Sequence, residues 1–249
     1  MGVGHWAFLF LLMLSAIIVA GGSSQRMGFD KLFAIIAGEP VIAHAIRAFD
    51  EATSVSEIIV VSREDRHDEI QKISRHAGFK KLRSIVPGGE RRQDSVRAGL
   101  GAIDPKAEYV AVHDAARPLI TPEQIEQTFE QCRVHGAAAL AQPVNDTLKR
   151  ADADLFITEP VDRHQLYAME TPQIFERKLI EDAYRAVYAQ NISVTDEVSA
   201  VEQFGHKVVL ILNDDFNFKI TYPRDLPLAE LVLRQRQDSA ATSRVGDRR

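Results

Sequence analysis

Short apolar runs and longer amphipathic stretches alternate along most of the chain. The runs are too short for helices and rich in Ile, Val and Ala, so they predict buried strands. These predicted strands are residues 17–20, 57–61, 82–86, 109–112, 137–141 and 207–212. The stretches between them predict helices, as Ile42, Ile46 and Phe49 fall on one face of a helix that Pro40 begins. Further predicted helices are residues 64–76, 93–100, 122–135, 176–190 and 224–234, and one that Thr195 caps and Gly205 ends. The alternation predicts an α/β fold with helices flanking a mostly parallel central sheet.

Residues 144–170 break this alternation, because they contain short β-like pieces and no clear helical pattern. We interpret them as an arm that leaves a single domain spanning residues 13–236. The last residues, 237–249, are mostly small and polar, which predicts a disordered tail.

The apolar run at residues 6–20 has two interpretations. A signal peptide or membrane anchor is one, but no Lys or Arg precedes the run, and a spanning helix needs roughly 18 to 20 residues. Residues 15–20 fit a buried parallel strand better. We therefore treat residues 1–12 as an N-terminal extension, with Met13 as an alternative start, and expect no membrane association.

Composition narrows the function classes. The 249 residues carry a formal net charge of −5, which argues against a general nucleic-acid binder with a basic surface. Cys132 is the only cysteine, so neither an internal disulfide nor a cysteine zinc site can form. We expect it to be buried in a helix, and a reducing compartment, the cytoplasm, fits this usage.

A glycine-rich loop with two cations follows the first predicted strand directly. Ala20, Gly21 and Gly22 let backbone N–H groups approach a polyphosphate, and Arg26 and Lys31 add positive charge. The loop lacks the Gly-Lys-Ser/Thr ending of a Walker A motif and the glycine spacing of a dinucleotide fingerprint. It predicts phosphate binding of another kind.

Two more motifs stand at predicted strand ends. Residues 87–95 form a glycine turn leading into a helix, where Gly89 and Ser95 offer backbone groups and a hydroxyl to a base or ribose. Residues 113–118 place Asp114 and Arg117 after another strand, within reach of a hydroxyl, a metal or a phosphate. A Ser-His-Asp hydrolase would need a nucleophile elbow, and the sequence has none.

These three motifs, in this order, resemble the 2-C-methyl-D-erythritol 4-phosphate cytidylyltransferase family. The resemblance runs from about Ser15 to Leu233 and includes five further motifs, at residues 146–150, 161–163, 171–173, 195–197 and 217–221. It implies a Rossmann-like nucleotidyltransferase fold and a homodimer whose extended β-arm corresponds to residues 144–170.

The resemblance also implies roles for single residues. The glycine loop would hold the triphosphate of CTP, with Arg26 and Lys31 stabilising the pentacovalent transition state. Gly89 and Ser95 match cytidine-binding positions. Arg163 and Lys219 match the pair that orients the attacking phosphate. The positions around the sugar phosphate are Asp114, Arg117, Thr147, Arg163, Thr171 and Lys219. Asp196 and Glu197 match the family without an assigned role.

The chain departs from the family pattern beside the loop lysine. Many relatives have Pro before it and Gln after it, where Asp30 and Leu32 stand here. We expect Asp30 to pair with Lys31 and lower its effective charge.

The residue types suit transfer between two anions, which needs cations and Mg²⁺ on the triphosphate rather than a general base. Asp114 is the one protein ligand for that metal we consider. Three alternatives stay open: another polyol phosphate acceptor such as ribitol 5-phosphate, a nicotinamide oxidoreductase, and a non-catalytic nucleotide-binding protein.

Overall fold

The central element is a seven-stranded sheet in the order β11-β7-β10-β6-β1-β4-β5. The computed structural model describes residues 13–22 and 27–246. β10 runs antiparallel to both its neighbours, and the other neighbouring strands pair in parallel. The sheet strands are β1 (Leu14–Ala20), β4 (Val55–Ser62), β5 (Leu82–Pro87), β6 (Tyr109–Asp114), β7 (Ala137–Pro143), β10 (Tyr167–Glu176) and β11 (Val209–Leu212). The predicted α/β class and mostly parallel sheet are therefore confirmed.

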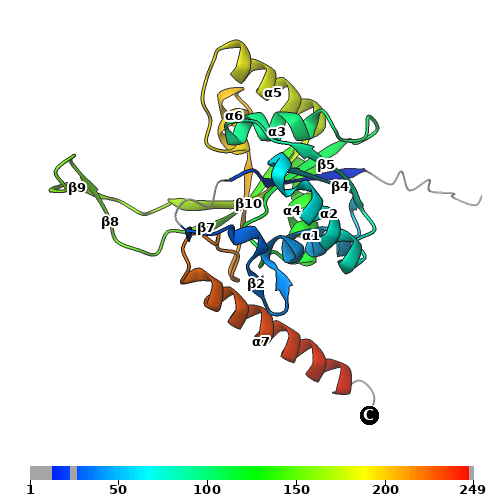
Figure 1. The fold of residues 1–249 in the computed structure, drawn as a ribbon. Helices are drawn as coiled ribbons and strands as arrows, with labels where there is room; N and C mark the ends of the chain where they lie inside the picture. The colour runs from blue at the N-terminus through cyan, green and yellow to red at the C-terminus, as the bar shows by residue number, and fades with distance from the viewer. Residues whose placement is uncertain (1–12, 23–26, 247–249) are drawn as a thin grey trace, which may run out of the picture.

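Helices cover both faces of the sheet (Figure 1). One group packs its apolar residues into the core on one face: α1 (Val41–Glu51), α2 (His67–Ala77), α4 (Pro122–His135) and α7 (Asp225–Gly246). The other group packs on the opposite face: α3 (Arg92–Leu100), α5 (Arg177–Ala189) and α6 (Glu197–Gln203). Short 3-10 helices, η2 (Lys31–Phe33) and η3 (Glu64–Arg66), and the small hairpin β2 (Ile35–Ile36) and β3 (Glu39–Pro40) complete the body.

Each strand contributes side chains to the hydrophobic cores on both faces of the sheet, because successive side chains point to opposite faces. In β1, Ala16 and Ile18 belong to one core and Ile17 to the other, and all three are fully buried. The helices supply matching apolar stripes, and Ile42, Ile46 and Phe49 of α1 are fully buried as their spacing predicts. The sheet is thus fixed from both sides, and its strand ends are rigid supports for the loops that follow them.

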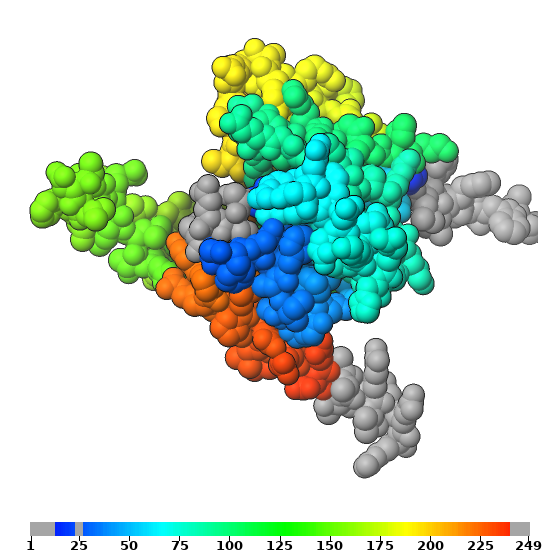
Figure 2. Space-filling model, in the orientation of Figure 1, coloured from blue at the N-terminus to red at the C-terminus, as the bar shows by residue number. Residues whose placement is uncertain are grey.

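The arm contains β8 (Leu148–Ala151) and β9 (Ile157–Val161), an antiparallel pair outside the main sheet. It projects from the body as a separate yellow-green lobe in Figure 2. This hairpin lies within the excursion predicted at residues 144–170. The C-terminal end of the excursion differs, because Tyr167 already begins β10, which then crosses the sheet to Glu176.

Two further predictions need correction. Asp196, not Thr195, is the N-cap of α6, and its carboxylate accepts a hydrogen bond from the Ser199 N–H at 3.0 Å. The last helix is longer than predicted, because α7 continues past residue 234 to Gly246. The tail predicted to be disordered from residue 237 is therefore helical as far as residue 246. Ala240 and Ala241 in this stretch are strong helix formers and no proline interrupts it. Residues 1–12, the predicted extension, lie outside the described part.

Within residues 13–22 and 27–246, no helix is both long enough and apolar enough to cross a membrane. Cys132 is fully buried in α4, as expected.

Candidate active site

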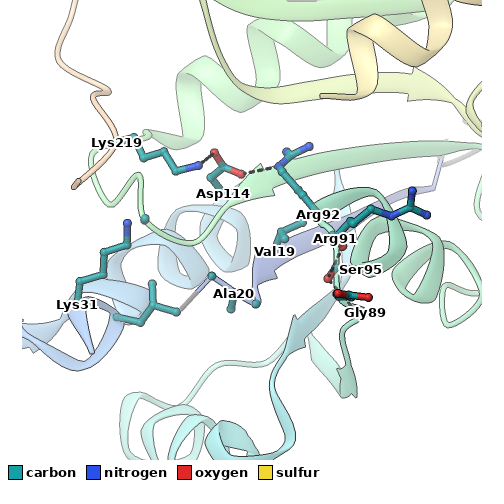
Figure 3. A pocket seen from close by; sticks show the side chains of 14 residues that line it. Val19, Ala20, Lys31, Gly89, Arg91, Arg92, Ser95, Asp114 and Lys219 are labelled. Carbon is teal, nitrogen blue, oxygen red and sulfur yellow. Dashed lines mark hydrogen bonds and ion pairs between the residues drawn. The ribbon is translucent and has the colours of Figure 1, made fainter. Parts of the chain in front are cut away.

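The candidate site is a pocket of about 340 Å³ at the carboxyl ends of the parallel strands (Figure 3). The segments that follow β1, β5 and β6 meet there because parallel strands end at the same edge of the sheet. The residues lining it are Val19, Ala20, Gly21, Gly22, Lys31, Leu32, Gly89, Glu90, Arg91, Arg92, Ser95, Asp114, Ala116 and Lys219.

The pocket gathers most of the residues that the sequence predicted. Eight predicted site residues line it: Ala20, Gly21, Gly22, Lys31, Gly89, Ser95, Asp114 and Lys219. Arg117 and Thr171 lie directly behind its wall, whereas Thr147 and Arg163 are on the arm and do not line it. Arg26 lies outside the described residues.

Two glycine turns, Gly21–Gly22 after β1 and Gly88–Gly89 after β5, lie on either side of the Ser95 hydroxyl. A Cβ on Gly89 would come within 2.3 Å of the Asp94 Cβ, so a larger residue cannot replace this glycine without moving the turn. The Gly89 N–H donates to Ser95 Oγ at 3.2 Å, and a Cβ on Gly21 would lie 3.4 Å from the same oxygen. Ser95 therefore lies between the two glycine segments, and its hydroxyl, predicted to bind cytidine, also donates to the Arg91 carbonyl at 3.4 Å.

Asp114 is the centre of a chain of charges on the pocket wall (Figure 3). One of its oxygens accepts from Lys219 Nζ at 2.8 Å and the other from Arg92 Nε at 3.2 Å. Burial disfavours the ionised carboxyl, but the charges of Arg92 and Lys219 outweigh it and hold the pKa of Asp114 well below its ordinary value. Asp114 is thus an anion that fixes two cations at the pocket.

The sequence motifs did not mark Arg92 as a site residue and left Glu197 without a role. Arg92 reaches past Asp114 to Glu197 Oε1 at 2.6 Å, and Glu197 is fully buried. The Tyr184 hydroxyl donates to the same oxygen at 2.9 Å. Burial opposes the charge of Arg92, but Glu197 and Asp114 raise its pKa above the ordinary value. Glu197 lies 105 residues from Arg92, so only the family motif, not local spacing, marked it.

A buried hydrogen-bond network supports Asp114 from behind. Thr171 Oγ1 contacts His113 Nδ1 at 3.0 Å and accepts from the Asp114 N–H at 3.1 Å. His113 Nε2 lies 3.1 Å from the Arg117 carbonyl, and burial lowers the pKa of His113 to about 4. The Arg117 guanidinium donates to the Asn217 carbonyl at 2.7 Å. His113 is therefore a neutral structural residue, and in this structure Thr171 and Arg117 support the pocket wall.

The expected pairing of Asp30 with Lys31 is replaced by another contact. Asp30 Oδ2 accepts from Arg66 Nε at 2.6 Å, and Oδ1 accepts from the Leu32 N–H at 3.2 Å. Lys31 Nζ donates to the Ile220 carbonyl at 2.6 Å, beside Lys219. The expectation failed because Arg66, 36 residues along the chain, is brought under the loop by the fold.

The arm presents apolar side chains and Arg163 to solvent. Leu155, Phe156 and Ile157 are 84%, 71% and 69% exposed. The exposed Arg163 contacts the carbonyl of Asn145 within the arm. The cation predicted to work with Lys219 therefore stands apart from the pocket of its own chain.

Three or more His, Cys, Asp or Glu side chains do not cluster into a metal site anywhere in the described residues. Both oxygens of Asp114, the one carboxylate we considered as a ligand, contact cations instead.

Comparison with known proteins identifies the family. The family model named 2-C-methyl-D-erythritol 4-phosphate cytidylyltransferase matches residues 14–235. A protein of that name from Caldanaerobacter subterraneus subsp. tengcongensis is 43% identical over 225 residues, which are 89% of this chain and 99% of the relative. A chloroplastic one from Oryza sativa subsp. japonica is 36% identical over 225 residues, covering 90% of this chain and 75% of the relative.

The fold agrees with this assignment. The crystal structure of 4-diphosphocytidyl-2C-methyl-D-erythritol synthase from Anaerococcus prevotii superposes with a TM-score of 0.79 at 31% identity, covering 90% of this chain and 97% of that one. Sequence and fold agree over nearly the whole chain, and it belongs to the 2-C-methyl-D-erythritol 4-phosphate cytidylyltransferase family.

Proposed function

We propose that the protein transfers CMP from CTP to 2-C-methyl-D-erythritol 4-phosphate, giving 4-diphosphocytidyl-2-C-methyl-D-erythritol and pyrophosphate for isoprenoid precursors. The observation that carries the proposal is the pocket, where two glycine turns meet Lys31, Arg92 and Lys219. Family membership favours the methylerythritol phosphate over ribitol 5-phosphate as acceptor. It also disfavours the oxidoreductase and the non-catalytic binding protein.

The reaction joins two anions, so charge neutralisation is the main task of the site. An oxygen of the acceptor phosphate attacks the α-phosphorus of CTP, and the bond from that phosphorus to the bridging oxygen of the β-phosphate breaks. The electron pair leaves with pyrophosphate. The attacking phosphate is already ionised near neutral pH and needs no general base. Cations fixed in advance, as Asp114 fixes Lys219, stabilise the developing charge without reorganising.

The pocket suits a triphosphate that arrives with Mg²⁺. Mg²⁺ keeps several waters and binds largely through phosphate oxygens, so it needs few protein ligands. The lysines and arginines of the lining and the engaged carboxylate of Asp114 fit this arrangement, and Asp114 would be the protein ligand if the ion took one. When bound, the ion supplies further charge neutralisation on the triphosphate.

We propose that the active form is a homodimer that exchanges arms. Exposed Leu155, Phe156 and Ile157 need a partner surface, and a two-fold dimer would cover both arms alike. Arg163 would then reach the partner's pocket and meet Lys219 there, together with Thr147. We place the protein in the cytoplasm, where a reduced Cys132 and a supply of CTP fit.

The decisive experiment measures pyrophosphate release by the purified protein with each nucleoside triphosphate and a panel of acceptors. We expect release with CTP and 2-C-methyl-D-erythritol 4-phosphate, and far less with ribitol 5-phosphate. Equal or faster turnover with ribitol 5-phosphate would overturn the acceptor assignment, and no turnover with CTP would overturn the reaction.

A further inference from the structure

An arginine outside every sequence motif lies beneath the first glycine turn. Arg66 ends η3, which follows β4, and its side chain is only 2% exposed. Its guanidinium donates to the carbonyl oxygen of Ala20, to that of Gly22 at 2.8 Å, and to Asp30 Oδ2 at 2.6 Å. All three nitrogens of this buried cation therefore have an acceptor on the segments that line the pocket.

The contact with Asp30 extends this hold to Lys31. Asp30 caps η2, the single turn that begins at Lys31, through its contact with the Leu32 N–H. Its backbone φ is −78°, inside the range that a proline ring would impose. The ion pair and the cap thus hold the chain in the conformation that proline would give at this position in the family pattern. One carboxylate therefore links the buried guanidinium to the turn that begins at Lys31.

The carbonyl contacts also orient the glycine turn. In a trans peptide the C=O and N–H groups point in opposite directions. Because the Ala20 carbonyl points at Arg66, the Gly21 N–H points away from Arg66, and Gly21 lines the pocket. A full positive charge on the carbonyl side favours this orientation, in which the N–H can face a phosphate.

We propose that Arg66, acting through Asp30 and the two carbonyls, is a positioning residue that sets the glycine turn and Lys31 for the triphosphate. The inference rests on the proposed role of this loop in CTP binding. Arg66 itself does not touch the substrate. Its effect is therefore expected on turnover and on CTP, and not on the acceptor.

The first test compares Arg66→Met with Arg63→Met. Arg63 stands three residues earlier, is about half exposed and pairs with the exposed side chain of Asp65, so it is a matched control. We expect Arg66→Met to lower kcat on the order of 10²-fold, as a misplacement of about 1 Å does. KM for CTP should rise, and KM for 2-C-methyl-D-erythritol 4-phosphate should stay within about twofold, since the acceptor makes no use of this loop. Arg63→Met should change none of these.

A second variant keeps the test decisive if Arg66→Met folds poorly. Asp30→Asn retains one oxygen to cap η2 and replaces the oxygen that accepts from Arg66 with an NH2 donor, so it removes the ion pair together with that hydrogen bond. We expect a loss of about tenfold in kcat, equivalent to one charge-assisted hydrogen bond. Thermal unfolding of each variant separates a loss of folded protein from a loss of turnover per folded site. A lower melting temperature with unchanged kcat in folded Arg66→Met, or in Asp30→Asn if the former does not fold, would overturn the proposal.

The third measurement asks whether Arg66 acts through Lys31. In a Lys31→Ala background the group to be positioned is gone, so Arg66→Met should cost clearly less than in the wild-type chain. An undiminished cost would overturn the part of the proposal in which Arg66 positions Lys31. Lys31→Ala alone retains Arg66, so a wild-type kcat in that variant would count against the proposed function of the loop, separately from Arg66.

Discussion

The pocket and the arm differ in how far contacts within one chain bury and pair their side chains. In the pocket, Asp114 and Glu197 are buried and each contacts Arg92. On the arm, Phe156 and Ile157 are 71% and 69% exposed. Contacts within one chain therefore hold the charges of the pocket in place, whereas the apolar side chains of the arm stay exposed, as at an interaction site.

The same contrast holds for charge. Arg150 and Glu159 pair across the arm at 2.6 Å, but both are more than half exposed, and such pairs contribute little to stability. Lys219 meets Asp114 at a similar distance on a carboxylate that is nearly buried, where water screens less. Substitutions in the pocket should therefore affect activity within one chain, and those on the arm should act through the proposed dimer.

The largest expected effect is at the pocket lysines. Lys31→Ala and Lys219→Ala should each lower kcat by about 10²- to 10³-fold, the loss seen when one preorganised electrostatic contact is removed. KM should change much less, because the contact strengthens in the transition state. Steady-state kinetics with pyrophosphate detection measures both. Arg150→Ala, a cation on the arm, is the control and should retain activity. A near-normal kcat in either lysine variant would remove that lysine from the mechanism.

The next effect tests whether Arg163 acts in the partner's pocket. Lys31→Ala and Arg163→Ala chains, each nearly inactive, are mixed, unfolded and refolded together. If Arg163 acts across the interface, each mixed dimer has one site with both changes and one with neither. With about half of the dimers mixed, about a quarter of wild-type activity should return. Mixed dimers that show no activity would place Arg163 in its own chain's site and contradict the exchange of arms.

Sequence patterns predicted the body of the molecule better than its charge contacts. Strand and helix positions follow from local periodicity, and the helix predicted at 122–135 begins and ends as expected because Thr121 caps it and Gly136 ends it at φ 79°. The pairing of β10 between β6 and β7 was not predicted, because strand order depends on contacts between distant segments.

The site was predicted residue by residue where motifs carry it, and missed where the fold brings distant residues together. Gly89, Ser95 and Asp114 were placed at strand ends and do meet at one pocket. Arg66 and its contact with Asp30 escaped notice because 36 residues separate them and Arg66 belongs to no motif. A buried arginine has no sequence signal of its own, since most arginines are exposed.

The smallest of the three effects distinguishes the buried and the exposed histidine. Burial lowers the pKa of His113 to about 4 in the folded protein, against 6.5 in an exposed histidine, even though Asp114 lies beside it. The unfolded state therefore binds the proton more readily, and stability is complete above pH 6.5 and falls as the pH drops from 6.5 toward 4. The slope is about 1.4 kcal/mol per pH unit, a tenfold change in the folding equilibrium, and the total is about 3 kcal/mol.

Urea unfolding at several pH values between 7.5 and 4.5 measures this slope. His113→Gln keeps groups that can contact Thr171 and the Arg117 carbonyl, but it cannot take up the proton. We expect it to be less stable than the wild type at pH 7.5, with the gap closing as the pH falls. His76→Gln, at an exposed position of α2 away from both the pocket and the arm, is the control and should follow the wild-type curve. A gap for His113→Gln that stays constant with pH would mean that burial does not keep this histidine neutral and that the pocket wall tolerates its charge.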